Sequence, residues 1–216
     1  MEKNEFKDKI RNLVSEFVDL VIEKAKDGEV AICTDLKKLD ARTIDVTSQS
    51  DLSLSCDDLD LVVTPSNDSQ IKYTLHIPET FKEEDVLVTS TSSDKKVEIE
   101  VKSLKQNING YVELDIPYSI KEVDLKTING DIKTKCIQID IVSLQSVNGD
   151  VKSESSSFNR ATFTTVDGDI DLRLDSDKYK IECRAKNGDV DNERESFNTS
   201  HKLVQCSTVN GDISIN

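Results

Sequence analysis

Apolar and polar residues follow two different periods along this chain. Within residues 3–27, apolar side chains recur at three- and four-residue intervals between Lys, Glu, Asp and Arg, which is the period of an amphipathic α-helix. Gly28 follows, where a helix commonly ends. The apolar positions are Phe6, Ile10, Leu13, Phe17, Leu20 and Val21. The sequence therefore predicts an N-terminal helix over residues 1–28. Its apolar face could cover a β-core, pair with a second copy or lie on a membrane; its mixed charges favour the membrane least.

From about residue 40 the period changes from 3.6 to 2. Apolar residues alternate with polar ones, as in Ile71, Tyr73, Leu75 and Ile77, and turn signals at residues 65–68 and 92–94 separate the runs. Such alternation predicts strands with one buried face and one face in water. We therefore expect residues 36–102 to form the N-terminal β-region of a β-domain.

A short word containing Asn-Gly or Asp-Gly recurs through the second half of the chain. Its six copies are Asn109-Gly110-Tyr111-Val112, Asn129-Gly130-Asp131-Ile132, Asn148-Gly149-Asp150-Val151, Asp167-Gly168-Asp169-Ile170, Asn187-Gly188-Asp189-Val190 and Asn210-Gly211-Asp212-Ile213. Successive glycines are 20, 19, 19, 20 and 23 residues apart. A fixed interval of this length is typical of repeat architectures.

The repeat extends beyond the word itself. Four residues before its first position the side chains are apolar, two residues before they are small, and three residues after they are Ile or Val. The apolar set is Leu125, Leu144, Phe163, Cys183 and Cys206; the small set is Thr127, Ser146, Thr165, Ala185 and Thr208. A solenoid produces such columns, because each rung places the same position above its predecessor at about 4.8 Å. We therefore predict an all-β fold, a β-solenoid or β-roll-like stack of about 20-residue rungs over residues 103–216, continuous with the preceding β-region and joined to one N-terminal amphipathic helix.

The glycine of each word is predicted to be structural. Gly and Asn tolerate positive φ, which tight corners between strands require. The predicted corner glycines are Gly110, Gly130, Gly149, Gly168, Gly188 and Gly211. We expect them to serve backbone conformation rather than chemistry.

The carboxylates that follow the glycines form a second row. Stacked in register, they would be like charges side by side, which is unfavourable unless water or a cation separates them. The residues are Asp131, Asp150, Asp169, Asp189 and Asp212. We favour a role in turns and solubility and therefore expect no cofactor. A Ca²⁺ ladder is the alternative, although Ca²⁺-binding β-rolls use a shorter repeat with more glycine.

These repeats resemble a known family. Residues 112–117 (VELDIP), followed by residues 123–132 (VDLKTINGDI) and then by serial NGD(I/V) words, are similar to the bacterial putative adhesins of the DUF4097 class. The resemblance covers residues 40–216 and is most specific over 112–213. It implies a β-repeat protein of bacterial origin, often linked to the cell envelope or its stress responses, and it implies no catalytic residues.

Composition and charge exclude some partners. The chain has 216 residues, with 28 basic against 42 acidic side chains and a formal charge of −14, so its average field repels nucleic acid. No apolar run reaches the roughly 18–20 residues that span a bilayer, and we find no basic region followed by an apolar stretch at the N-terminus. We expect a protein that is cytoplasmic, or surface-associated without a classical signal peptide.

Candidate catalytic groups are few. His76 alternates with Leu75 and Ile77 as an outward strand residue, and His201 is remote in sequence from it. The five cysteines, Cys33, Cys56, Cys136, Cys183 and Cys206, lack the CxxC spacing of a zinc or redox site. We expect a noncatalytic protein with buried free thiols. A disulfide between Cys183 and Cys206, which share a column, is the alternative.

Two functions remain open. The first is a noncatalytic binding or scaffold module, adhesin-like or associated with the cell envelope, with a protein or glycan partner. The second is an intracellular sensor or assembly component of an envelope-stress system that self-associates through residues 3–27. Because the chain stops just after its last word, at residues 210–216, we also expect an open stack end that is covered by the N-terminal helix, a second subunit or a further segment.

Overall fold

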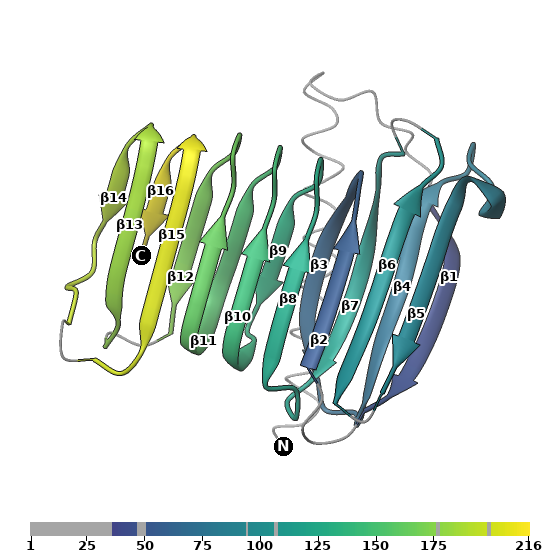
Figure 1. The fold of residues 1–216 in the computed structure, drawn as a ribbon, viewed down its shortest axis with the longest axis horizontal. Helices are drawn as coiled ribbons and strands as arrows, with labels where there is room; N and C mark the ends of the chain where they lie inside the picture. The colour runs from purple at the N-terminus through teal and green to yellow at the C-terminus, as the bar shows by residue number, and fades with distance from the viewer. Residues whose placement is uncertain (1–35, 47–50, 94, 106–107, 176–177, 198–199) are drawn as a thin grey trace, which may run out of the picture. The chain divides into compact units, whose positions relative to one another are not determined.

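The structure is a computed structural model that describes residues 36–46, 51–93, 95–105, 108–175, 178–197 and 200–216. The described residues of Lys37–Asn216 form one compact unit. The described part contains sixteen strands and one short 3-10 helix, Glu83–Asp85 (Figure 1). It is therefore built from β-structure, as the alternating pattern predicts.

The strands form two sheets that share one long strand. In spatial order, the first sheet contains β1 (Leu36–Asp45), β4 (Gln70–Pro78), β7 (Gly110–Pro117), β3 (Leu59–Ser66), β9 (Ile132–Lys135), the start of β11 (Val151–Thr164), β12 (Ile170–Leu174), β16 (Ile213–Ile215) and β14 (Val190–Asn192). The second contains β5 (Val86–Ser92), β6 (Lys96–Ser103), β2 (Asp51–Cys56), β8 (Glu122–Lys126), β10 (Gln138–Gln145), the rest of β11, β15 (Leu203–Asn210) and β13 (Lys180–Asn187). The two predicted parts of the β-domain, residues 36–102 and 103–216, thus each contribute strands to both sheets.

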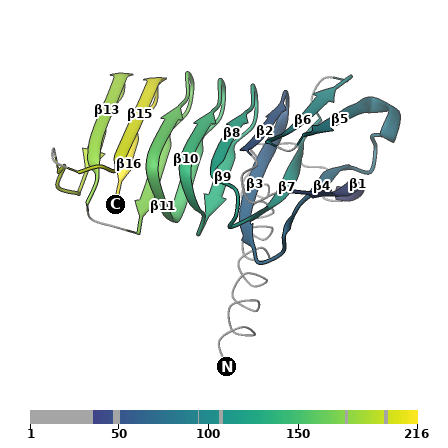
Figure 2. The same ribbon diagram turned by 60° about the horizontal axis from the view of Figure 1, so that its bottom comes forward.

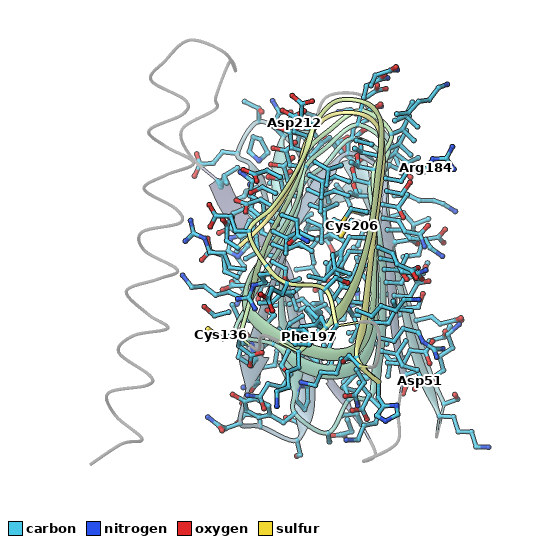
Figure 3. The ribbon with its side chains drawn as sticks, turned by 90° about the vertical axis from the view of Figure 1, so that its left-hand side faces the viewer. Asp51, Cys136, Arg184, Phe197, Cys206 and Asp212 are labelled. Atoms are coloured by element: carbon cyan, nitrogen blue, oxygen red, sulfur yellow. The ribbon has the colours of Figure 1, made fainter. Side chains whose placement is uncertain are left out.

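Each rung of the stack crosses from the second sheet to the first through a corner, and in every rung but β2/β3 this corner holds the repeated word. In Figure 3, which looks along the stack, Asp212 lies near this corner, Cys136 lies near the opposite one and Cys206 lies between the sheets. At the opposite corner the chain turns at Cys136 and Ser155, with φ of 55° and 49°. These residues are one repeat apart, so the left-handed conformation recurs from rung to rung.

The core consists of apolar columns that run through both sheets. Because strands within the stack are parallel and in register, equivalent side chains lie beside one another. One column of the second sheet is Leu54, Leu125, Leu144, Phe163, Cys206 and Cys183. The facing column of the first sheet is Leu61, Ile132, Val151, Ile170, Ile213 and Val190. All are buried except Cys183 and Val190 at the β13/β14 end, where the core is open.

The stack does not follow chain order, which corrects the prediction that each rung lies on its predecessor. The rung β15/β16, which carries Gly211, lies between the rungs of Gly168 and Gly188. The rung β2/β3 lies between the first and second words, because β3 pairs with both β7 and β9. Figures 1 and 2 show β13, rather than the C-terminal strand, at the end of the stack.

The predicted fold class is wrong in pairing the stack with an α-helix. The described residues contain no α-helix; their only helical element is the 3-10 turn Glu83–Asp85. The segment predicted as a helix, residues 3–27, lies outside them, and so does Cys33. Within the same described ranges, no helix is both long and apolar enough to cross a bilayer. The fold class supported by the structure is an all-β stack of two sheets.

The stack order predicts which engineered cysteines form a disulfide. Asp171 on β12 is the register partner of Ser214 on β16. We expect Asp171→Cys with Ser214→Cys to cross-link, because in-register neighbours lie about 4.8 Å apart, within disulfide range. Asp171→Cys with Asp191→Cys should not cross-link, because β16 lies between β12 and β14. Mass spectrometry of non-reduced digests measures both, and cross-linking of the second pair alone would contradict the order.

Candidate functional site

The corner glycines are required by close approach between rungs. An added Cβ at Gly149 would lie 2.2 Å from the carbonyl oxygen of Gly130, and one at Gly168 would lie 2.3 Å from that of Gly149. Gly211 and Gly188 continue the row, at 2.0 and 2.1 Å from the carbonyl oxygens of Gly168 and Gly211. Among the described glycines only Gly211 has a positive φ, 156°. The sequence argument from positive φ therefore gives the wrong physical reason for the corner glycines other than Gly211.

The small column before each word donates hydrogen bonds to this row. Ser146 Oγ donates to Gly130 O at 2.9 Å, and Thr165 Oγ1 donates to Gly149 O at 2.9 Å. Thr208 Oγ1 makes the same bond to Gly168 O at 3.1 Å. These hydroxyls are buried, so each bond pairs two polar groups that water does not reach. A small residue in this column therefore fits the corner, and a hydroxyl there also gives the glycine carbonyl oxygen of the neighbouring rung a hydrogen-bond donor.

The aspartate row is a ladder of carboxylate to backbone bonds. The Oδ1 atom of Asp131 accepts the N–H of Asp150 at 2.9 Å, and that of Asp150 accepts the N–H of Asp169 at 2.9 Å. Asp169 accepts from Asp212, and Asp212 accepts from Asp189, each at 2.8 Å. Each carboxylate thus fixes the backbone of the next rung. This bonding offsets the repulsion between neighbouring charges.

The ladder begins at a residue that the sequence analysis missed. Asp60 Oδ1 accepts the N–H of Asp131 at 2.8 Å. Burial raises the pKa of Asp60, and Lys133, 3.9 Å away, opposes this. Burial also opposes ionisation of Asp131, but Lys133 at 2.9 Å, together with backbone bonding, leaves the pKa of Asp131 below its ordinary value. Asp60 and Asp131 are neighbours in the row, but folding favours the protonated form of Asp60 and the ionised form of Asp131.

The Ca²⁺ ladder that the sequence analysis gives as the alternative concerns these same carboxylates. Within the described ranges, no three or more His, Cys, Asp or Glu side chains are grouped as metal ligands. One oxygen of Asp131, Asp150, Asp169 and Asp212 already accepts a backbone N–H. The prediction of no bound cation and the alternative of a Ca²⁺ ladder both stay open, and calorimetric titration with Ca²⁺ would test them.

A second row joins the first residues of the words. Asn129 Nδ2 donates to Asp58 Oδ1 at 2.6 Å, and Asn148 Nδ2 donates to Asn129 Oδ1 at 2.7 Å. A separate run starts at Asp167, which accepts from Asn210, and Asn187 Nδ2 donates to Asn210 Oδ1 at 2.7 Å. A carboxylate has no hydrogen to donate, so Asp58 and Asp167 each begin a run as acceptors.

The aspartate ladder predicts unequal effects for two substitutions at Asp150. Asp150→Asn should change the free energy of unfolding by less than about 0.5 kcal/mol, because the amide oxygen still accepts the N–H of Asp169. Asp150→Ala should cost about 1–2 kcal/mol, because that N–H loses its partner. Urea unfolding measures both. If Asp150→Asn costs as much as Asp150→Ala, the charge matters more than the acceptor.

Asp60 should make the protein more stable at lower pH. A carboxyl whose pKa is raised by folding binds its proton more tightly in the folded state, so its contribution to stability falls as pH rises through the folded-state pKa. Asp60→Asn keeps the acceptor for Asp131 without the charge, so we expect greater stability at neutral pH. The gain should shrink as pH falls through the folded-state pKa. Urea unfolding across this pH range tests it, and a gain that grows on acidification would contradict the assignment.

An apolar ridge runs along the outside of the same corner. Ile128, Val147 and Val166, each one residue before a word, are 45%, 40% and 37% exposed on consecutive rungs. We call these three residues the corner ridge. Contiguous exposed apolar surface, unlike a single exposed apolar residue, is a mark of interaction sites.

The two histidines lie far apart in the strand order. His76 on β4 stacks on Tyr111 of β7, with ring centroids 4.3 Å apart, and its Nε2 lies 3.4 Å from Glu113 Oε2. His201 precedes β15, which pairs with β11 and β13 toward the other end of the stack. The fold therefore does not bring them to one site.

The end of the stack is the rung β13/β14, so the expectation of an open end at residues 210–216 is wrong about which rung it is. Within the described residues, β13 pairs with β15 only. Part of its other edge is covered by its own chain: Ser196 Oγ accepts the N–H of Ile181 at 3.0 Å, and Phe197 N–H donates to Tyr179 O at 2.8 Å. Beyond Ile181, no strand among those that the structure describes pairs with this side of β13.

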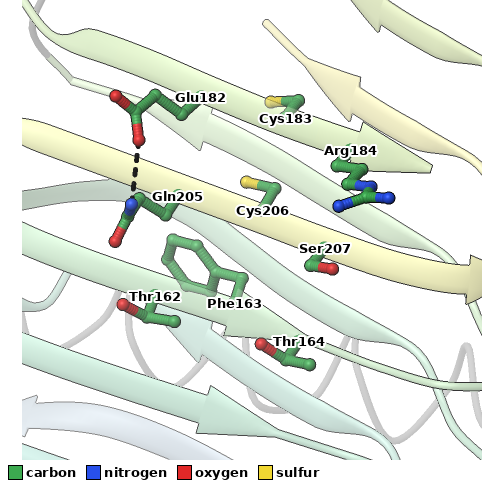
Figure 4. Close-up of a pocket in the computed structure, with 9 residues that line it drawn as sticks. All are labelled: Thr162, Phe163, Thr164, Glu182, Cys183, Arg184, Gln205, Cys206 and Ser207. Carbon is green, nitrogen blue, oxygen red and sulfur yellow. Dashed lines mark hydrogen bonds between the residues drawn. The ribbon is translucent and has the colours of Figure 1, made fainter.

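A shallow pocket of about 320 Å³ lies across β11, β15 and β13 beside this end (Figure 4). Phe163, Cys206 and Cys183 are among its lining residues. Two further lining residues are hydrogen-bonded to each other, with Gln205 Nε2 donating to Glu182 Oε2 at 2.8 Å. Cys183 and Cys206 are free thiols, as are Cys56 and Cys136. The predicted column thus brings two cysteines together at the open end.

Sequence reasoning missed one complete corner. Asp58-Leu59-Asp60-Leu61 occupies the place of a word in the β2/β3 rung, with Leu59 where the glycine would be and with Asp58 and Asp60 starting the two ladders. Its DxDL pattern was the available signal, but without glycine it does not match the repeat.

Comparisons with known proteins agree with this architecture. The family model described as Toastrack DUF4097 matches residues 10–216. A structure of a putative cell adhesion protein from Clostridium sporogenes is similar, with 15% identity and a TM-score of 0.67 over 84% of this chain and 99% of that one. A structure of a putative adhesin from Bacteroides fragilis has 14% identity and a TM-score of 0.47 over 83% of this chain and 98% of that one. A comparison with curated proteins found no match.

The first of these structures shows a shared fold, and the family model covers nearly the whole chain. The serial NGD(I/V) words that suggested the resemblance are the corners of the observed stack. The chain belongs to the Toastrack DUF4097 family.

Proposed function

We propose that this chain is a noncatalytic scaffold that binds a protein partner along the corner ridge. The observation that carries the proposal is the exposure of Ile128, Val147 and Val166 on three consecutive rungs. Equivalent positions recur at about 4.8 Å, so an extended partner segment could contact all three. A rigid stack presents such a line without paying to order it on binding.

The noncatalytic part of the proposal is supported by how the corner polar groups are used. The hydroxyls of Ser146 and Thr165 and the carboxylates of Asp131 and Asp150 are bonded to neighbouring rungs. Groups held this way maintain the stack and are poor candidates for proton transfer. The separation of His76 from His201 gives further support.

Charge at the corner indicates the chemistry of the partner. Residues 128–131, 147–150 and 166–169 contain acidic but no basic side chains. The whole chain carries a formal charge of −14. A partner segment with apolar residues flanked by Lys or Arg therefore fits the ridge best, because it would complement both its apolar and its acidic character.

The test compares two sets of substitutions of similar exposure. Ile128→Ser, Val147→Ser and Val166→Ser together remove the ridge; Leu87→Ser with Leu104→Ser removes exposed apolar residues elsewhere. A partner retained by the unaltered chain from extracts of the source cells would be identified, purified and titrated against all three proteins. We expect the ridge variant to bind at least about tenfold more weakly, with the control unchanged and with affinity falling as salt rises.

Two outcomes would overturn the proposal. In one, the purified partner binds the ridge variant as tightly as the unaltered chain. In the other, neither extracts nor purified components yield a partner. Unfolding curves of all the variants establish that each one is folded before its binding is compared.

A further inference from the structure

Cys183 and Cys206 are register partners on neighbouring parallel strands. Cys183 lies on β13 and Cys206 on β15. Their α-carbons should therefore be separated by about the inter-strand spacing, 4.8 Å, which lies within the 4.4–6.8 Å range of disulfides. Figure 4 shows their sulfur atoms extending in the same direction from the two strands.

The other described cysteines lack such a partner. Cys56 pairs in register with Val101 of β6 and donates its S–H to Leu59 O at 3.2 Å. Cys136 lies at the opposite corner, and its backbone N–H donates to Glu154 O at 2.8 Å. Of the four described thiols, only Cys183 and Cys206 form a neighbouring pair. Cys56 and Cys136 therefore serve as internal controls.

Exposure gives the two thiols different roles. Cys206 is 3% exposed, between Phe163 and Cys183 in the apolar column, whereas Cys183 is partly exposed on the edge strand. The pocket of about 320 Å³ reaches both. A small oxidant would therefore meet Cys183 first, and Cys206 would be the adjacent second thiol.

The electrostatics of the pair agree with this order. Interaction with the neighbouring Cys206 thiol holds the pKa of Cys183 below its ordinary value, although burial opposes the effect. Interaction with the Cys183 thiol, and then burial, raise the pKa of Cys206 well above its ordinary value. Since the thiolate is the nucleophile, Cys183 is the more reactive of the two.

We infer that Cys183 and Cys206 form a peroxide-sensitive dithiol that closes to a disulfide at the edge of the stack. The Cys183 thiolate attacks one peroxide oxygen; the S–O bond forms, the O–O bond breaks, and the leaving hydroxide takes a proton to become water. The sulfur of Cys206 then attacks the Cys183 sulfenic acid; the S–S bond forms, the S–O bond breaks, and the Cys206 proton leaves with hydroxide as a second water. Two electrons pass from the two sulfurs to the peroxide, so the step needs no other reactant.

The edge position makes closure feasible and gives it a consequence. In the described residues β13 pairs with β15 alone, so it can adjust toward the geometry of a disulfide. The bond would tie the last rung covalently to its neighbour and enclose β14 within the closed loop. Oxidation would therefore suppress the local unfolding in which β13 separates from β15 near Cys183 and Val190. This inference is independent of the corner ridge and of any partner.

The experiment uses the full chain with Cys33→Ser, treated with hydrogen peroxide and then alkylated. Non-reduced digests analysed by mass spectrometry should contain a cross-linked peptide joining Cys183 to Cys206, lighter by two hydrogen atoms, while Cys56 and Cys136 stay alkylated. Hydrogen exchange of the β13 amides should slow by at least about tenfold on oxidation and recover on reduction.

Matched variants assign the two steps. Cys206→Ser should leave Cys183 as a sulfenic acid that dimedone labels, with no internal cross-link. Cys183→Ser should make Cys206 resistant to peroxide, and Cys136→Ser should leave cross-linking unchanged. The inference is overturned if Cys183 is oxidised no faster than Cys136, if the cross-link joins other cysteines, or if Cys206→Ser does not trap a labelled Cys183.

Discussion

Gly149→Ala is expected to lower the free energy of unfolding by about 3 kcal/mol, the upper end of the usual cost of overpacking. The added Cβ would lie 2.2 Å from Gly130 O and 2.6 Å from Gly130 C, both backbone atoms of the neighbouring rung. Relief would require the two rungs to separate. That movement would stretch the Ser146 to Gly130 bond and the Asp150 to Asp131 bond at the same corner.

Two comparisons separate this effect from a general weakness of the corner. Val147→Ala, two residues away on the exposed ridge, should cost less than about 1 kcal/mol. Gly188→Ala meets an equally close carbonyl, at 2.1 Å, but in the edge rung, which is free to move outward. It should therefore cost clearly less than Gly149→Ala. Urea unfolding measures all three, and equal effects at Gly149 and Gly188 would contradict the role of rung spacing.

The sequence located the corners because every copy obeys the same steric demand. Gly130, Gly149 and Gly168 each face the backbone of an adjacent rung, so a side chain is excluded at each. The period was therefore visible without coordinates. Its physical reason was not, because glycine is equally compatible with positive φ and with close approach.

The order of the rungs could not be predicted, because the side chains in each column do not specify which rung lies next to which. Val204 and Cys206 of β15 fit beside Ala161 and Phe163 of β11 as readily as Ile181 and Cys183 of β13 would. Inserting the last rung before the fifth word preserves every apolar column. The longer interval between Gly188 and Gly211 was the one irregularity in the sequence at this point. It contains Ser196, which lies along the edge of β13 and accepts the N–H of Ile181.

The start of the ladders was hidden for a related reason. Leu59 occupies a glycine position, and its own carbonyl oxygen would lie 2.1 Å from a Cβ at Gly130. The β3 strand on which Leu59 lies meets β7 on its other side, where the register partner of Leu59 is Gly110 of the first word. A leucine is tolerated there because its side chain is buried in the core, whereas the corners that follow must repeat the same close contact.

Phe163→Ala should destabilise the protein by about 3–5 kcal/mol, since it removes a fully buried ring from the centre of the core. Phe163 is 0% exposed, lies in register between Leu144 and Cys206, and packs edge-to-face on Phe158 with centroids 5.8 Å apart. Parallel rungs on both sides hold the backbone at the inter-strand spacing. The column therefore cannot collapse into the cavity, which places the cost toward the upper part of this range.

Two further substitutions show whether the loss comes from the column. Phe163→Leu gives the position the same residue as Leu125 and Leu144 and should cost less than about 1.5 kcal/mol. Thr162→Ala, one residue earlier and on the outer face, should stay within about 0.5 kcal/mol. Urea unfolding with unchanged m-values would attribute the differences to the folded state. If Phe163→Ala cost no more than Thr162→Ala, side chains in register along the second sheet would not form the core. Because the corners depend on that core to hold adjacent rungs together, their ladders would then need another source of stability.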